Sequence, residues 1–155
     1  MKLLLTEQVD AVALAIKQIE KNKGFIVGDM AGIGKGRIVA GVCRYAKQQN
    51  KIPVFITIGS TLFSDQYRDI NDIGGYNGSV VPLNNDEKLP NAFIFNEDGS
   101  IIKTIKGEEV VIQKSLKTSI VVEFCNKKVM PTNTDVVFLT YSQLSADVSK
   151  PNNSK

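Results

Sequence analysis

The sequence lacks histidine and tryptophan entirely, and it contains only two cysteines among 155 residues. Without histidine, the chain has neither the usual general base at neutral pH nor the commonest zinc ligand. Any chemistry must therefore come from carboxylates, lysines, arginines, hydroxyl groups or the backbone. Cys43 and Cys125 lie in apolar surroundings and match no metal-ligand spacing, so we expect buried free thiols in a reducing, intracellular (cytoplasmic) compartment.

Long hydrophobic runs are also missing. The apolar stretch at the start, MKLLL, is too short for a signal peptide, and no stretch approaches the roughly 20 apolar residues of a membrane-spanning helix. The net charge is only +3, from 19 basic and 16 acidic residues, which is too weak to indicate nucleic acid by itself. With 43% hydrophobic content, residues 1–155 are expected to form one domain with a sizeable core.

The hydrophobic pattern predicts an α/β fold with a parallel sheet. Short, continuously apolar runs are typical of strands buried on both faces of such a sheet, and apolar residues at helical spacing follow them. In the first helix the inward positions would be Val9, Val12, Ile16 and Ile19, with Thr6 as the cap. Helices are expected at 6–21, 37–49 and 60–73, and strands at 24–29, 53–58 and 134–140.

The middle of the chain, residues 79–128, shows a different pattern. Short apolar runs flank Asp98-Gly99, which is a strong signal for a hairpin turn. Residues 117–128, KTSIVVEFCNKK, would add another strand. We therefore expect a β-rich, antiparallel insertion within the α/β domain.

One stretch, GDMAGIGKGR at residues 28–37, is similar to a phosphate-binding loop. Between a strand and a helix, successive backbone N–H groups can surround phosphate oxygens, and the helix N-terminus adds positive potential. Gly32 and Gly34 allow a close approach of the backbone and positive φ angles. Lys35 is placed to reach the β- and γ-phosphates. A plain strand-to-helix turn with an exposed lysine is the alternative.

The loop departs from the strict pattern G-x-x-x-x-G-K-[ST] at two positions. Asp29 stands at the first glycine, which is tolerable because Gly28 precedes it. Gly36 stands where a hydroxyl normally coordinates Mg²⁺, so a metal held here would need more water ligands or acids from elsewhere. A dinucleotide site is a weaker alternative, since Arg37 occupies its last glycine position.

Two segments, GFIVGDMAGIGKGRIVAGVCRYA and PVFITIGSTLFSDQYRDINDIGG, together resemble the helicase-like ATPase region of strawberry notch proteins. These belong to superfamily 2 and are related to Snf2-type translocases; the family also carries GKGR. The resemblance covers about residues 4–76 and 134–145. It implies an incomplete three-layer, RecA-like P-loop NTPase core with ATP and Mg²⁺ as cofactors. The implied partner of the full-length protein is nucleic acid, with DNA favoured.

The same resemblance implies roles for individual residues. Gln8 would read the adenine edge, against the alternative of a solvated helix residue. Asp29 matches an acid that opens the Snf2-type loop, against a turn or cap residue. The implied nucleotide-binding residues are Gln8, Asp29, Gly32, Ile33, Gly34, Lys35, Gly36 and Arg37.

Two turns would contact nucleic acid if the resemblance holds. The first contains Thr57, Ser60 and Thr61, and its alternative is helix capping by Ser60 or Thr61. The second contains Thr140, Tyr141 and Ser142, and its alternative is a buried tyrosine at a strand end.

The acidic pair that superfamily 2 enzymes use to hold Mg²⁺ and activate water is missing from the sequence. Asp86-Glu87 follows no strand and Glu108-Glu109 follows a glycine, so neither fits. We expect a fragment that binds ATP without turning it over, has no catalytic or metal-ligating side chain, and self-associates through an uncovered sheet edge. A different P-loop enzyme and a non-catalytic interaction module with a relic loop remain alternatives.

Overall fold

The computed structural model describes residues 4–28, 32–74, 79–83, 89–90, 111–113, 118–130 and 133–144. Within these ranges the helices are α1 (Thr6–Ile19), α2 (Lys35–Gln48), α3 (Leu62–Ile73), α4 (Thr118–Lys127) and α5 (Tyr141–Leu144). The strands are β1 (Val54–Thr57), β2 (Ser79–Pro82), β3 (Leu89–Pro90), β4 (Val111–Gln113) and β5 (Thr134–Thr140).

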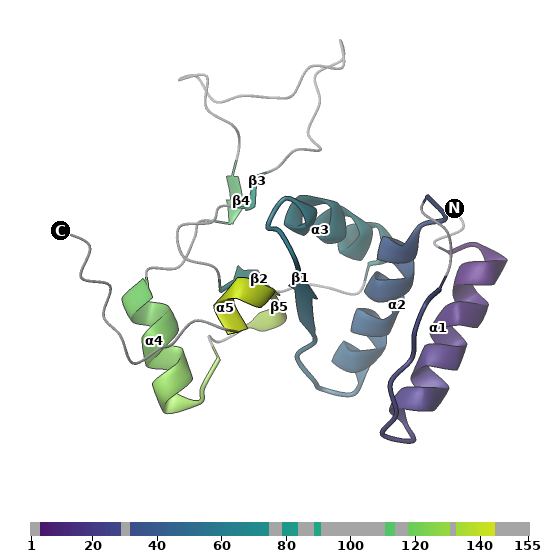
Figure 1. Cartoon of the computed structure of the whole chain (residues 1–155), viewed down its shortest axis with the longest axis horizontal. Helices are drawn as coiled ribbons and strands as arrows, with labels where there is room; N and C mark the ends of the chain where they lie inside the picture. Colours follow the sequence, from purple (N-terminus) through teal and green to yellow (C-terminus); the bar gives the residue numbers. More distant parts are fainter. Residues whose placement is uncertain are drawn as a thin grey trace, which may run out of the picture.

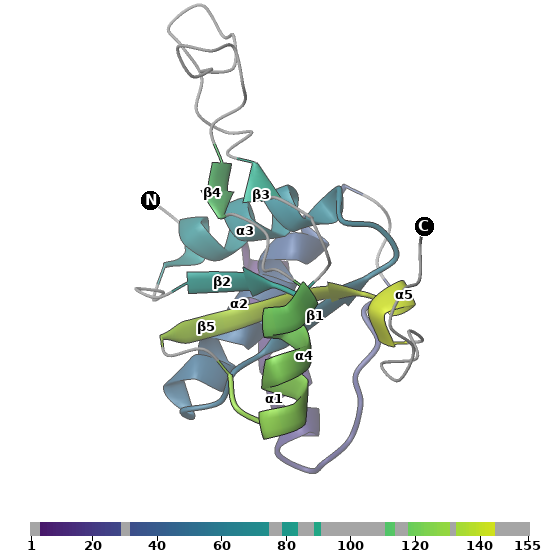
Figure 2. The same cartoon turned by 90° about the vertical axis from the view of Figure 1, so that its left-hand side faces the viewer.

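Three of the strands form a parallel sheet in the order β1-β5-β2. The sheet lies between α4 on one face and α2 with α3 on the other, and α1 packs on the outside of α2 (Figures 1 and 2). This arrangement confirms the predicted α/β fold with a parallel sheet. β3 and β4 form a separate antiparallel pair. β2, which begins the range predicted as the insertion, pairs with β5 in the parallel sheet.

The hydrophobic core lies between the sheet and the α2–α3 layer. Phe138 of the central strand contacts the rings of Phe55 and Phe63, each with its ring centroid at 5.2 Å. Ile70 of α3 and Val136 of β5 are also completely buried in this cluster. The continuous apolar run in β5 is therefore explained by burial on both faces of the central strand.

The strand predicted at 24–29 is not formed in the described part, residues 24–28. This segment pairs with no strand of the sheet, and Figure 1 draws it as coil. Phe25 is exposed and Ile26 is 90% exposed. A β-strand exists only when its backbone groups pair with a neighbour, so an apolar run without a neighbour stays irregular.

Residues 118–127 form helix α4 rather than the predicted strand. Ile120, Val121 and Phe124 recur at helical spacing, and this period agrees with the helix. The hairpin turn predicted at Asp98-Gly99 lies outside the described residues. The bounds of the insertion, 79–128, stay a prediction.

Helix α1 buries a face that overlaps the predicted one only in part. Gln8 and Ala15 are its buried residues, Val12 and Ile16 are half-buried, and Val9 and Ile19 are exposed. The helix begins without a side-chain cap from Thr6, because Leu5 is the N-cap residue and its N–H is bonded to the side chain of Gln8. Cys43 is buried, as predicted, and forms no disulfide with a described residue. Cys125 lies in α4, where its side chain is outside the description.

None of the described helices is long and apolar enough to cross a membrane.

Candidate nucleotide site and the carboxyl ends of two strands

The predicted phosphate-binding loop leads into α2 through two glycines with positive φ. Gly32 has a φ of 93° and Gly34, the N-cap residue of α2, has a φ of 78°. No side chain among the described residues caps α2, and its first turn holds no acid. An uncapped helix N-terminus without a nearby acid in its own first turn is a suitable anion site. Lys35 is the first residue of α2 and is exposed, as is Ile33 in the loop.

Gln8 connects α1 to this loop. Gln8 is only 4% exposed, which rules out the alternative of a solvated helix residue. Nε2 donates to the carbonyl of Ile33 at 3.1 Å, and Oε1 accepts from the N–H of Leu5 at 2.9 Å. A side-chain amide has a second donor and further acceptor capacity, so these bonds leave one of each for a ligand. The role in adenine reading stays a prediction.

Helix α3 approaches the first turn of α2 at Gly36. Gln66, which is buried, donates from Nε2 to the carbonyl of Gly36 at 3.2 Å. A Cβ at position 36 would overlap Oδ2 of Asp69 and would lie 3.2 Å from its Cγ. The glycine is therefore needed for the close packing of α2 on α3. Sequence reasoning missed Gln66 and Asp69, and the only signal for them was a glycine at a helical position.

Arg37, which was predicted to hold the triphosphate, bonds to α3 in this structure. Its Nη2 lies 2.6 Å from Oδ2 of Asp72, and both side chains are partly exposed. Asp29 lies outside the described residues. The structure thus places six of the eight predicted nucleotide-binding residues around the start of α2, and it directs Arg37 toward α3.

The two turns predicted to contact nucleic acid lie side by side. In the parallel pair β1–β5, Thr57 is the register partner of Thr140, so both turns leave the same edge of the sheet. Thr57 and Thr140 are buried, and the hydroxyls of Thr140 and Ser142 are 2.7 Å apart. Tyr141 is 59% exposed, so the alternative of a buried tyrosine at a strand end is wrong.

The start of α3 shows no capping by its N-cap residue. Thr61 takes this position and makes no side-chain cap hydrogen bond, whereas the carbonyl of Ser60 accepts from the N–H of Phe63 at 2.9 Å. Ser60 is half-buried and Thr61 is exposed. Helix capping therefore does not explain why a threonine stands at position 61.

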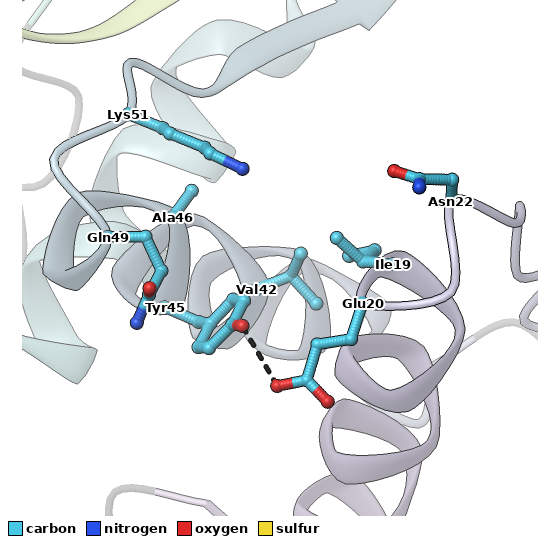
Figure 3. A pocket seen from close by; sticks show the side chains of 8 residues that line it. All are labelled: Ile19, Glu20, Asn22, Val42, Tyr45, Ala46, Gln49 and Lys51. Carbon is cyan, nitrogen blue, oxygen red and sulfur yellow. Dashed lines mark hydrogen bonds between the residues drawn. The ribbon is translucent and has the colours of Figure 1, made fainter.

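A cavity of about 200 Å³ lies elsewhere, where the carboxyl-terminal ends of α1 and α2 meet (Figure 3). Tyr45 donates to Oε1 of Glu20 at 3.1 Å across this cavity. Desolvation and the hydrogen bond to the Glu20 carboxylate raise the pKa of Tyr45. The predicted phosphate-binding loop lies at the opposite end of α2, so this cavity is separate from the candidate nucleotide site.

Comparison with known families agrees with the loop geometry. Residues 2–155 match the family model described as P-loop containing NTP hydrolase pore-1. The chain belongs to this family. The match confirms the P-loop NTPase fold class, and the open three-stranded parallel sheet is consistent with an incomplete RecA-like core.

Several curated proteins are similar to part of the chain. Protein FORGETTER 1 of Arabidopsis thaliana is 46% identical over 68 residues, covering 43% of this chain and 5% of that protein. Protein strawberry notch of Drosophila melanogaster is 41% identical over 63 residues, covering 39% and 4%. The Caenorhabditis elegans strawberry notch homolog is 35% identical over 106 residues, covering 63% and 6%.

The predicted resemblance to strawberry notch proteins is thus confirmed. The chain spans only about a twentieth of the length of these relatives. No solved structure matches it.

Proposed function

We propose that this chain binds ATP, with Mg²⁺, as part of a helicase-like ATPase related to strawberry notch proteins. The observation that carries the proposal is the uncapped start of α2. There, Gly34 in the left-handed conformation is followed at once by Lys35, in a chain that belongs to a P-loop NTPase family. The backbone N–H groups and helix dipole supply positive potential, and Lys35 supplies a positive charge for the terminal phosphates.

Calorimetric titration of ATP into the purified chain, with Mg²⁺ present, tests this proposal. We expect saturable binding to one site, and much weaker binding of AMP, because AMP lacks the β- and γ-phosphates. Equal binding of ATP and AMP would contradict a phosphate-directed site. No binding of ATP by the folded chain would favour the interaction-module alternative.

We further propose that the chain alone does not hydrolyse ATP. Hydrolysis in such enzymes needs a carboxylate that activates water, held at the end of an apolar strand. No acid follows β5 directly, because Tyr141 and Ser142 come next. Asp86-Glu87 come shortly after β2, so the prediction that no strand precedes this pair is wrong, and the pair itself lies outside the described residues. The remaining requirements for turnover would come from the rest of the parent protein.

The proposed nucleic-acid surface is the sheet edge where β1 and β5 end. Two observations support this proposal. The two turns are adjacent, and each carries an exposed residue, Thr61 after β1 and Tyr141 after β5. An exposed aromatic ring stacks on bases, and exposed hydroxyls and N–H groups bond to phosphates. DNA stays the favoured nucleic acid.

Replacing Tyr141 by alanine should weaken binding of single-stranded DNA by about tenfold, because loss of one stacked base costs about 1–3 kcal/mol. Fluorescence anisotropy at several salt concentrations would measure the affinity. The slope of affinity against salt should stay the same, since the phosphate contacts remain. Leu144→Ala is the matched control, because Leu144 is equally exposed on the same short helix. Equal losses in both variants would argue against stacking on Tyr141.

Self-association also belongs to this proposal. Val54 and Ile56 of β1 are exposed, and in the described part of the chain β1 pairs only with β5. An open apolar edge strand is a template for pairing with a second copy.

A further inference from the structure

The missing hydroxyl of the phosphate-binding loop has a structural counterpart on α3. Gly36 provides no side chain after Lys35, and a Cβ built at this position would overlap Oδ2 of Asp69. The hydroxyl of a serine or threonine would be bonded to that same Cβ. A carboxylate oxygen therefore lies where the Cβ that carries the Mg²⁺-binding hydroxyl of other P-loops would stand.

Within the described part of the chain, the two oxygens of the Asp69 carboxylate differ in their hydrogen bonds. Oδ1 accepts from Nε and Nη2 of Arg68, each at 3.3 Å. Oδ2, the oxygen next to Gly36, has no hydrogen-bond donor among the described residues. Asp69 is only 8% exposed, and buried polar atoms are normally paired. A buried, unpaired carboxylate oxygen beside a phosphate site is suited to a hard cation.

The charge of Asp69 supports a cation at this position. Asp69 contacts the first turn of α2 at Gly36, whereas Asp65 and Asp72 are paired with Arg68 and Arg37. A triphosphate bound at this turn would meet the Asp69 carboxylate as a like charge, which is unfavourable at short range. A divalent cation between the two would convert this repulsion into attraction.

The position of Asp69 is fixed by neighbouring contacts. Gln66, one turn earlier on α3, holds the carbonyl of Gly36. Arg44 of α2 donates to the carbonyl of Ile73 at 2.8 Å, near the end of α3. These two bonds fix α3 against α2 on both sides of Asp69, so the carboxylate does not depend on a flexible segment for its place.

We propose that the carboxylate of Asp69 is the side-chain ligand of the Mg²⁺ that accompanies a bound nucleotide, in place of the hydroxyl that Gly36 lacks. The described residues hold no cluster of three or more acidic, cysteine or histidine ligands. The remaining ligands are phosphate oxygens and water, as is usual for Mg²⁺. This inference rests on the proposed binding of ATP, and it assigns a metal ligand where the sequence alone indicated none.

Calorimetric titration of ATP, in Mg²⁺ and in EDTA, tests Asp69→Asn against the unchanged chain. In the unchanged chain we expect Mg²⁺ to strengthen ATP binding. In Asp69→Asn the strengthening of ATP binding by Mg²⁺ should be at least about tenfold smaller, because loss of a metal-site residue typically weakens metal binding by this factor. Binding in EDTA should be equal or tighter in the variant, because a negative charge beside the phosphates has been removed. Asp65→Asn is the control, since Asp65 is more exposed and pairs with Arg68.

A double variant separates a metal ligand from a packing residue. Asp69→Ala should lose the gain from Mg²⁺, and Gly36→Ser combined with Asp69→Ala should regain it, because the space now admits a hydroxyl. Thermal melting of each variant verifies that it is folded. An unchanged gain from Mg²⁺ in Asp69→Asn would overturn the inference while leaving ATP binding intact. Absence of ATP binding by the unchanged chain in both buffers would overturn the proposed function itself.

Discussion

Lys35→Ala should remove most of the affinity for ATP without unfolding the chain. A lysine that bonds to terminal phosphates contributes charge-assisted hydrogen bonds, so its loss should cost about 3 kcal/mol, or roughly 100-fold in affinity. Because Lys35 is exposed, its replacement should change the free energy of unfolding by less than about 0.5 kcal/mol. Calorimetric titration of ATP and chemical denaturation measure the two quantities on the same preparation.

Lys17→Ala is a suitable control for the loss of one positive charge. Lys17 is exposed on α1, near its carboxyl-terminal end and away from the loop. We expect ATP affinity to be unchanged in this variant. Equal affinity in Lys35→Ala and in the unchanged chain would mean that residues 28–37 form a plain turn.

The sequence predicted those parts of the fold that depend on local pattern. β5 is a continuous apolar run and lies at the centre of the sheet, as expected. The run at 24–28 has the same character but forms no strand, because strand formation requires a neighbour and apolar pattern does not report one. The prediction of a strand at residues 118–127 was wrong for another reason. Their β-branched composition favoured a strand, although the spacing of their apolar residues is helical.

The candidate site was predictable to a similar extent. The loop and Lys35 follow from a local motif and stay a prediction, whereas the family match confirms the P-loop NTPase fold class. The contact between Gly36 and Asp69 joins residues that are far apart in the sequence, so no local pattern reveals it. The exposure of Tyr141 also depends on where β5 ends relative to its neighbours, which the sequence leaves open.

The loop is held from two sides by side-chain amides. Gln8 of α1 bonds to the carbonyl of Ile33, and Gln66 of α3 bonds to the carbonyl of Gly36. Both glutamines are buried, and both leave the N–H groups at the start of α2 unblocked by a side-chain cap. Such support positions the backbone donors before a ligand arrives, which lowers the entropic cost of binding.

Gly34→Ala should therefore destabilise the fold and distort the loop together. Its φ of 78° strains any residue with a Cβ, and that Cβ would overlap Nε2 of Gln8, breaking its bond to Ile33. Strain and the lost hydrogen bond together should cost about 2–4 kcal/mol, measured by chemical denaturation. Gly32→Ala has the strain but open space, so it should cost only about 1 kcal/mol. Gly24→Ala introduces neither strain nor overlap and should leave the free energy of unfolding unchanged. Equal stability of all three variants would show that Gln8 does not hold the loop.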